Sequence, residues 1–202
     1  MAPRALLLDI GNVLLRFDLG PWHRRAAIGS RAGVDPATDK ELETLKCDYE
    51  SGRIDRVDFL ATARKRLDYS GSDAELIEAW CDIFEENRPM TDLVRAMQGR
   101  MPMHLLSNTN DLHLQFIRER FPVFALLPEG VYSHEAGSMK PEARIFERAV
   151  AQLGLDPATT VYVDDLAPNI ATAESLGFRC VHYHPDRHAD ALDRMRGHGL
   201  GV

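Results

Sequence analysis

The chain has 202 residues and a formal net charge of −7, with 45% hydrophobic and 27% charged residues. These values are typical of a folded protein with one sizeable core, and they exclude a disordered, collagen-like or low-complexity chain. The negative charge disfavours a protein that binds nucleic acid through its overall field, and no apolar stretch approaches the roughly 20 residues that span a bilayer.

The apolar run near the start of the chain is short and ends at a carboxylate, whereas a signal peptide needs a longer one. We therefore expect a cytoplasmic protein, with no membrane partner and no nucleic-acid partner. Cys47, Cys81 and Cys180 are odd in number and form no C-x-x-C pair, so neither a disulfide framework nor a thiolate metal site is indicated. The sequence makes no prediction of oligomeric state.

The first predicted element is a buried strand at residues 4–10. Its four consecutive apolar residues, Ala5 to Leu8, are typical of a strand that helices cover on both faces. Residues 16–88 then turn helical, and an insertion of this length is longer than ordinary connections. We expect a helical cap at residues 16–88, set into an α/β core formed by residues 1–15 and 89–202.

Three amphipathic helices are predicted within the insertion. The third is the most clearly marked, because Ser72 and Glu75 have the spacing of a capping box. The first ends at Ser51-Gly52, a plausible stop signal. The apolar stripes are Leu42, Leu45 and Tyr49 in the first helix, Val57, Leu60, Ala61 and Leu67 in the second, and Leu76, Ile77, Trp80, Ile83 and Phe84 in the third.

After Pro89, which disfavours helix at the residue before it, apolar strands alternate with amphipathic helices. Strands joined by single helices imply a parallel sheet. The predicted fold class is therefore α/β, a Rossmann-like parallel sheet flanked by helices and interrupted by an α-helical cap. The predicted segments are helix 92–98, strand 103–106, helix 111–120, strand 123–127, helix 142–153, strand 160–163, helix 168–176, strand 179–182 and helix 189–195.

Reactive side chains follow the predicted strands at the edge of the sheet where ligands bind in such folds. A lysine joins them at the start of a helix, after the strand-like Val131-Tyr132. This set of carboxylates, one hydroxyl and one lysine suits phosphoryl transfer, in which the protein mainly positions reactants and offsets charge. The residues are Asp9, Ser107 with Asn108, Lys140, and Asp164 with Asp165.

Asp9 is placed to act as a covalent nucleophile, because a carboxylate can form an acyl-phosphate that water later hydrolyses. Ser107 and the backbone N–H groups around Asn108, close to a helix N-terminus, can donate hydrogen bonds to phosphoryl oxygens. Lys140 can supply a compact positive charge.

Charge counting predicts a metal ion. Three carboxylates and a phosphate dianion bring about five negative charges together, and like charges ~4 Å apart repel by roughly 4 kcal/mol per pair at an effective dielectric near 20. Lys140 alone cannot offset that repulsion. Mg²⁺ prefers oxygen ligands and would bridge Asp9, the Asp164-Asp165 pair and the phosphoryl group.

The motifs and their order resemble the haloacid dehalogenase superfamily over nearly the whole chain. The helical insertion lies where that family has its C1-type cap. The resemblance implies that Asp9 is the nucleophile and that the carbonyl of Gly11 is a metal ligand. The four matching segments are residues 9–14, 105–108, 133–141 and 163–165, the last with Asn169 and Gly177.

By the same resemblance, Asp164 and Asp165 hold Mg²⁺ directly or through water, and Ser107, Asn108 and Lys140 bind phosphate. Gly11 combined with Ser-Asn-Thr-Asn at 107–110 is most similar to the bacterial α-glucose-1-phosphate phosphatase group. The implied function is a Mg²⁺-dependent phosphatase of small phosphorylated metabolites, among them sugar phosphates.

Gly11 is a departure from the family pattern, because most phosphatases of the family carry a second aspartate there as general acid and base. A positioned proton donor is worth about 10²- to 10⁴-fold in rate, which predicts slow turnover or a preference for good leaving groups. Changing Gly11 to Asp is expected to speed the hydrolysis of poor leaving groups if the new carboxylate reaches the substrate oxygen.

Two alternative functions stay open. One is a metal-independent 2-haloacid dehalogenase, which the retained Asp164-Asp165 pair disfavours. The other is a catalytically impaired phosphate-binding protein. The cluster of His182, His184 and His188 is interpreted as solvated histidines of a surface loop in preference to a zinc site.

Overall fold

The computed structural model describes residues 2–202, and its centre is a five-stranded sheet in the order β5-β4-β1-β6-β7. All four strand pairs are parallel. This arrangement confirms the predicted α/β fold class with a Rossmann-like parallel sheet. The strands are β1 (Ala5–Leu8), β4 (Met103–Ser107), β5 (Gly130–Tyr132), β6 (Thr160–Asp164) and β7 (Arg179–His182).

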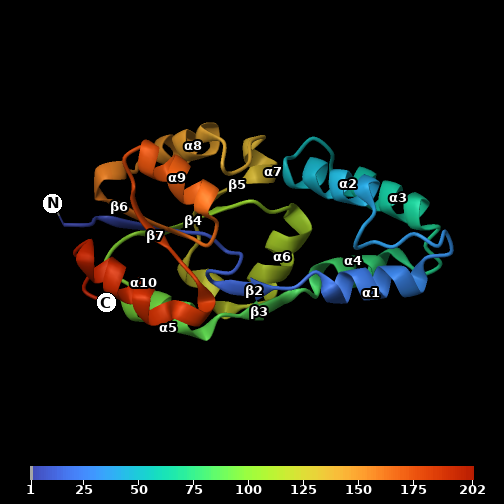
Figure 1. Cartoon of the computed structure of the whole chain (residues 1–202), viewed down its shortest axis with the longest axis horizontal. Helices are drawn as coiled ribbons and strands as arrows, with labels where there is room; N and C mark the ends of the chain where they lie inside the picture. The colour runs from blue at the N-terminus through green and yellow to red at the C-terminus, as the bar shows by residue number, and fades with distance from the viewer. Residues whose placement is uncertain (1) are drawn as a thin grey trace.

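Helices cover both faces of the sheet (Figure 1). Because side chains of a strand alternate between its faces, Leu6 and Leu8 of β1 pack into one core while Ala5 and Leu7 pack into the other. The first core is covered by α5 (Arg88–Met97), α6 (Asp111–Arg120) and α10 (His188–Gly197), and the second by α8 (Ala143–Leu153) and α9 (Ala167–Ser175).

Four helices between β2 and β3 form a separate lobe beyond one end of the sheet (Figure 1). The lobe has its own core, in which the rings of Trp22 and Trp80 meet edge-on with centroids 5.1 Å apart. The predicted capping box of Ser72 and Glu75 starts its last helix. The elements are β2 (Leu15–Phe17), α1 (Gly20–Gly29), α2 (Lys40–Glu50), α3 (Arg56–Leu67), α4 (Asp73–Cys81) and β3 (Phe84–Glu86).

Contacts at several places join the inserted lobe to the α/β core, among them the bonds of Tyr49 and Arg56 to Asp111 on α6. The antiparallel pair β2 and β3 brings the two connecting segments side by side. The ring of His113, also on α6, lies with Nε2 2.9 Å from the carbonyl oxygen of Trp80. The hydroxyl of Ser133, on the short helix α7 (Ser133–Ala136), donates to the carbonyl of Glu50 at the end of α2.

The strand predicted at residues 123–127 is wrong. The segment forms the 3₁₀ helix η1 (Pro122–Leu126), and the edge strand is β5 instead. Val123 and Phe124 are buried, so the apolar character was correct, but a short apolar run does not distinguish a strand from a buried helical turn. Two further 3₁₀ helices, η2 (Pro157–Thr159) and η3 (Pro185–Arg187), lie in later connections.

Two helical details also differ from expectation. Helix α5 begins at Arg88, because Pro89 lies in its first turn, where the missing N–H has no helical acceptor to lose. In α3 the predicted apolar stripe is rotated: Val57 is 67% exposed, and the buried side chains are Phe59, Ala63 and Leu67. The hydrophobic pattern identified this helix and the burial of Leu67, but not Phe59 and Ala63 on its buried face.

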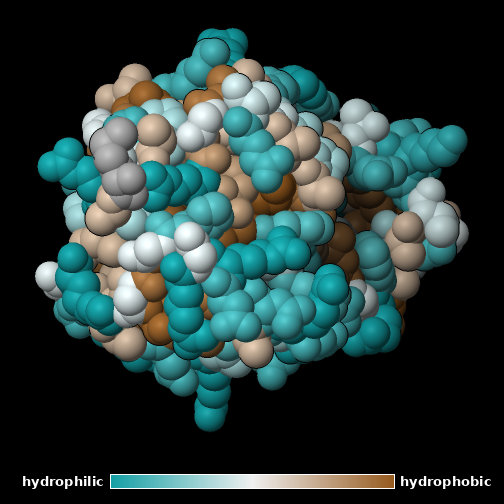
Figure 2. Space-filling model, turned by 60° about the vertical axis from the view of Figure 1, so that its left-hand side comes forward, coloured by the Kyte–Doolittle hydropathy of each residue, from teal (hydrophilic) through white to brown (hydrophobic). Residues whose placement is uncertain are grey.

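The face seen in Figure 2 is largely hydrophilic, with hydrophobic side chains concentrated in its recesses. None of the helices within residues 2–202 combines the length and the apolar character needed to cross a bilayer.

Candidate active site

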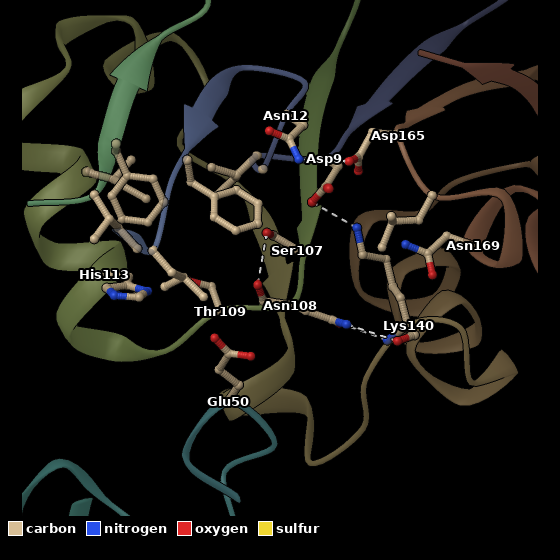
Figure 3. A pocket seen from close by; sticks show the side chains of 18 of the residues that line it. Asp9, Asn12, Glu50, Ser107, Asn108, Thr109, His113, Lys140, Asp165 and Asn169 are labelled. Carbon is tan, nitrogen blue, oxygen red and sulfur yellow. Dashed lines mark hydrogen bonds and ion pairs between the residues drawn. The ribbon is translucent and has the colours of Figure 1, made fainter. Parts of the chain in front are cut away.

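A cavity of about 210 Å³ lies between the carboxyl edge of the sheet and the inserted lobe (Figure 3). Two sets of side chains enclose it, and they differ in chemistry. We name the polar set the strand-end wall, formed by Asp9, Ser107, Asn108, Lys140 and Asp165. The opposite set, the insertion wall, is formed by Phe17, Leu19, Lys46, Glu50, Ile83 and Phe84.

Asp9 follows directly after β1, and its side chain reaches the cavity although the residue is only 7% exposed. Its backbone N–H donates to the carbonyl of Val163 at 3.0 Å, which extends the β1–β6 ladder to this residue. One carboxylate oxygen, Oδ1, lies 2.8 Å from Nζ of Lys140. The nucleophile predicted from the sequence is therefore held by both its backbone and its side chain.

Lys140 gathers two carboxylates around one ammonium group. Its side chain is 2% exposed, and Nζ lies 2.8 Å from Asp9 Oδ1 and 2.6 Å from Asp164 Oδ2. Nζ also donates to the carbonyl of Leu106 at 3.0 Å. An ammonium group has three protons, so each of them has an acceptor on the protein.

Asp164, the last residue of β6, is fully buried and its carboxylate accepts several hydrogen bonds. The donors are Lys140, the hydroxyl of Tyr162, the backbone N–H of Leu166 at 2.8 Å, and Nδ2 of Asn169 at 2.9 Å from Oδ1. Burial alone would raise the pKa of Asp164, but the charge of Lys140 and these hydrogen bonds outweigh it and hold the pKa below its usual value. This carboxylate is ionised and largely saturated.

Asp165 is less constrained and only partly buried. Its Oδ2 accepts one side-chain hydrogen bond, from Nδ2 of Asn12 at 3.0 Å. Asn12 adopts the left-handed backbone conformation, with φ of 52°, which asparagine tolerates better than most residues. Burial raises the pKa of Asp165, and the bond from Asn12 opposes that rise.

The three carboxylates form a potential metal centre, because one oxygen from each of Asp9, Asp164 and Asp165 lies within 4.8 Å of the others. Three carboxylates beside one lysine leave an excess of negative charge. Burial raises the pKa of Asp9 to about 7 despite Lys140, and the nearby Asp164 adds to the rise. An all-oxygen donor set short of positive charge fits Mg²⁺.

The C-terminal histidines lie outside this metal-ligand group in the part of the chain that the structure describes. Each of these histidines contacts a different part of the protein. His182 lies with Nε2 2.8 Å from the carbonyl oxygen of Asp165, His184 accepts from the N–H of Asp186, and His188 contacts the hydroxyl of Tyr183.

Ser107 and Asn108 end β4, at the cavity, as the sequence predicts. Ser107 is buried, and its hydroxyl makes only a long contact, 3.5 Å, with the carbonyl of Asn108. The side chain of Asn108 instead pairs twice with the backbone of Lys140, at 2.8 and 2.9 Å. The Asn108 amide thereby fixes the segment that carries the lysine.

Gly11 leaves room for an aromatic ring. A Cβ atom at this position would lie 3.2 Å from the ring of Phe17, which β2 brings alongside. The same Cβ would lie 4.0 Å from Oδ2 of Asp9. The place next to Asp9 is therefore occupied by an apolar side chain of the insertion wall.

Several polar residues around the site were not assigned to it from the sequence. Tyr162 could have been found, because it lies two residues before Asp164 on the same strand and therefore on the same face. Asn12 lies within a recognised motif but carried no assigned role. Glu50 gave no signal, because its approach to Asp9 depends on how the inserted lobe docks. His113 lies on α6 of the core, outside the motifs read from the sequence.

Comparison with known proteins gives one consistent result. The model of the haloacid dehalogenase-like hydrolases matches residues 3–177. A D-ribitol-5-phosphate phosphatase of Bacteroides thetaiotaomicron is 26% identical over an alignment of 197 residues that covers 92% of this chain and 93% of that protein. A sesquiterpene phosphatase of Aspergillus oryzae is 23% identical over 183 residues, 89% of each chain.

The solved structures agree with the sequence relatives. The crystal structure of a haloacid dehalogenase family enzyme of Bacteroides thetaiotaomicron, in complex with magnesium and inorganic phosphate, matches with a TM-score of 0.80 at 26% identity. The match covers 91% of this chain and 94% of that one.

Proposed function

Because this chain belongs to the haloacid dehalogenase-like hydrolase family, we propose that it is a Mg²⁺-dependent phosphatase of small phosphorylated metabolites, with Asp9 as its nucleophile. One observation carries the proposal: Asp9 faces the cavity at the end of β1, inside a cluster of three carboxylates whose oxygens lie within 4.8 Å of one another. Such a cluster leaves an excess of negative charge that a bound cation would offset.

In the proposed reaction, an oxygen of Asp9 attacks phosphorus and the ester P–O bond breaks, so that the phosphoryl group is held as an aspartyl-phosphate. Water then attacks this phosphorus, and Asp9 leaves as a carboxylate. Ser107 and the backbone N–H groups around Asn108 would bind phosphoryl oxygens, because they end a strand close to the N-terminus of α6. Lys140 would orient Asp9 and offset its charge.

Asp9, Asp165 and the carbonyl of Gly11 would hold Mg²⁺. Asp164 would contribute mainly by position and charge, because its oxygens already accept hydrogen bonds from four residues. The bound ion would supply positive charge to the phosphoryl oxygens during transfer. Asn12 would orient Asp165 through its hydrogen bond.

The substrates we propose are sugar phosphates or sugar-alcohol phosphates. Lys46 and Glu50 of the insertion wall can bond to hydroxyl groups, while Phe17 and Phe84 can pack against the carbon chain. A relative that spans nearly the whole chain is a D-ribitol-5-phosphate phosphatase, which supports this class.

The test is Mg²⁺-dependent hydrolysis of p-nitrophenyl phosphate, combined with mass spectrometry of the protein after acetyl phosphate treatment. We expect phosphate on Asp9, loss of turnover by about 10⁴-fold or more in Asp9→Asn, and inhibition by EDTA. A panel of phosphorylated sugars and polyols would then identify the preferred ester.

Two outcomes would contradict the proposal. Undiminished turnover of 2-haloacids in EDTA would indicate a dehalogenase. Phosphate-ester binding by the wild-type protein with Mg²⁺, but without turnover of either test compound, would indicate a binding protein.

A further inference from the structure

Glu50 presents a carboxylate to the cavity without a partner. It is the last residue of α2, it lines the cavity, and it is only partly exposed. Its backbone carbonyl is anchored by the hydroxyl of Ser133, but no hydrogen bond or ion pair joins its carboxylate to another residue within 2–202. Figure 3 shows this side chain pointing into the cavity, across from Asp9. A partly buried carboxylate without a partner is stabilised by a proton or by a ligand.

Few other groups in the cavity are free to exchange a proton with a substrate. His113 has both ring nitrogens in contact with protein atoms, 2.9 Å from the carbonyl oxygen of Trp80 and 3.1 Å from Nδ2 of Asn110. Lys140 has all three protons committed. Asp9 and Asp165 are needed by the reaction itself. Lys46 and Glu50 remain, and both come from α2.

The leaving group of the ester needs a proton as it departs. The geometry of phosphoryl transfer indicates that this proton comes from the insertion wall. Attack and departure at phosphorus lie roughly in line, so the leaving oxygen points away from Asp9. The side of the cavity away from Asp9 is where Glu50 lies (Figure 3). The end of α2 cannot drift from this position freely, because Ser133 bonds to the carbonyl of Glu50 and also accepts from the N–H of Thr109 at 2.9 Å.

The surroundings of Glu50 also suit proton transfer near neutral pH. Burial raises the pKa of its carboxyl group to about 7, and the charge of Lys46 only partly opposes this. The C-terminal end of a helix further disfavours a negative charge. The other charged or titratable groups around it are His113 and Asp111 on α6, His134 and Glu135 on α7, and Asp9, Lys140 and Asp165 across the cavity.

We propose that Glu50 is a catalytic residue of the reaction, acting as general acid on the leaving group and then as general base on water. The inference rests on the proposed phosphatase function. As the ester P–O bond breaks, its electron pair stays on the leaving oxygen, which takes the proton of Glu50 and departs as an alcohol. The Glu50 carboxylate then takes a proton from the water that attacks the aspartyl-phosphate, and both carboxyl groups return to their starting states.

The experiment compares two esters in wild-type protein and Glu50→Gln, both with Mg²⁺. One is p-nitrophenyl phosphate, whose leaving group needs little protonation, and the other is D-ribitol 5-phosphate, an alkyl ester that needs it. We expect kcat for the alkyl ester to fall about 10²- to 10³-fold, and kcat for the aryl ester to change by less than about threefold. In wild-type protein, kcat for the alkyl ester should fall as pH rises above about 7, and Glu50→Gln should lack this fall.

Two control variants accompany the test. Glu43→Gln removes an exposed carboxylate from the same helix and should leave both esters unaffected. Glu50→Asp keeps a carboxyl group and should recover part of the alkyl activity. Thermal melting of each variant checks that the inserted lobe stays folded.

Equal losses on both esters, or a change in KM alone with the pH dependence intact, would overturn the proposal and leave Glu50 as a binding residue. Hydrolysis of the aryl ester by wild-type protein without hydrolysis of any alkyl ester in the panel would overturn it too. Absence of turnover of both kinds of ester by wild-type protein would instead contradict the phosphatase function itself.

Discussion

The two walls of the cavity are built in opposite ways. In the strand-end wall, Asp9 and Lys140 are almost fully buried and joined at 2.8 Å. The β1–β6 ladder holds the backbone of Asp9, and the Asn108 amide holds that of Lys140. In the insertion wall, Phe17 is 43% exposed and the carboxylate of Glu50 has no bonded partner among the described residues. A preorganised polar wall suits a reaction step common to all esters, whereas a looser wall suits discrimination among leaving groups.

The contrast follows from how each wall is held. The parallel ladder of β4, β1 and β6 positions Asp9, Ser107 and Asp165, and the Asn108 amide then positions Lys140. The insertion wall reaches the site because the lobe docks through α4 on α6, through Tyr49 and Arg56 on Asp111, and through α2 on α7. Local contacts of that kind are more easily opened than a sheet core.

The largest expected difference between the walls is in the cost of removing a lysine from each. Lys140→Met leaves two carboxylates of the buried cluster without their cation and should cost about 3–5 kcal/mol in the free energy of unfolding. Lys46→Met is its matched partner on the insertion wall and should cost less than about 1 kcal/mol. Urea denaturation in EDTA measures both, and equal losses would break the comparison.

Docking of the insertion wall can be tested at Gly52, which has φ of 72° and lies just beyond α2. A Cβ atom there would lie 2.1 Å from the carbonyl oxygen of His134, so Gly52→Ala must push the end of α2 away from α7. We expect kcat/KM for alkyl phosphates to fall about 10²-fold, because a shift of about 1 Å at a catalytic group costs that much.

Gly33→Ala is the control for this change. Gly33 has a similar φ, 66°, but no atom within 4 Å of its Cβ position, so it carries the conformational cost without the clash. Loss of stability without loss of alkyl phosphatase activity should result. If both alanine variants reduced kcat/KM equally, the α2–α7 contact would have no role in catalysis.

A smaller effect is expected within the strand-end wall, at Asn12. Asn12→Gly keeps the left-handed backbone and removes only the hydrogen bond to Asp165, so the Kd for Mg²⁺ should rise about tenfold. Asn12→Ala should weaken Mg²⁺ binding equally and should also lower stability by about 1 kcal/mol, because alanine is strained at positive φ. Calorimetric Mg²⁺ titration and thermal melting separate the two effects, and unchanged Mg²⁺ affinity in both variants would show that Asp165 needs no support.

Much of the strand-end wall could be predicted from the sequence, because its physical signals are local. The run from Ala5 to Leu8 marked β1, and the carboxylate after it had to lie at the carboxyl edge of a parallel sheet. Asp164 followed from the same reasoning at β6. The sequence could not predict that Asn108 pairs with the backbone of Lys140, because those residues meet only in the folded chain.

The insertion wall was largely invisible in the sequence for the same reason. Glu50 lies at the end of a correctly predicted helix, but nothing in its spacing says that the helix end meets α7 and faces Asp9. The prediction for residues 123–127 was wrong for a different reason. The burial of this apolar segment was predicted correctly, and only its backbone conformation was wrong. Hydrophobic patterns are a good guide to which residues are buried. They are a poorer guide to which helices and strands pack against one another.

The smallest expected effect concerns Gly11, where the two walls meet. Gly11→Asp must displace the Phe17 ring, which is possible because that ring is 43% exposed. In wild-type protein we expect less than about a threefold change in alkyl ester hydrolysis, because Glu50 already supplies the proton; in Glu50→Gln we expect a gain of about tenfold. Gly11→Asn fills the same space without an acidic proton and should give no gain. Equal rates for the Asp and Asn variants in the Glu50→Gln background would mean that a carboxyl group beside Asp9 cannot reach the leaving oxygen. The leaving oxygen could then be protonated only from the insertion wall.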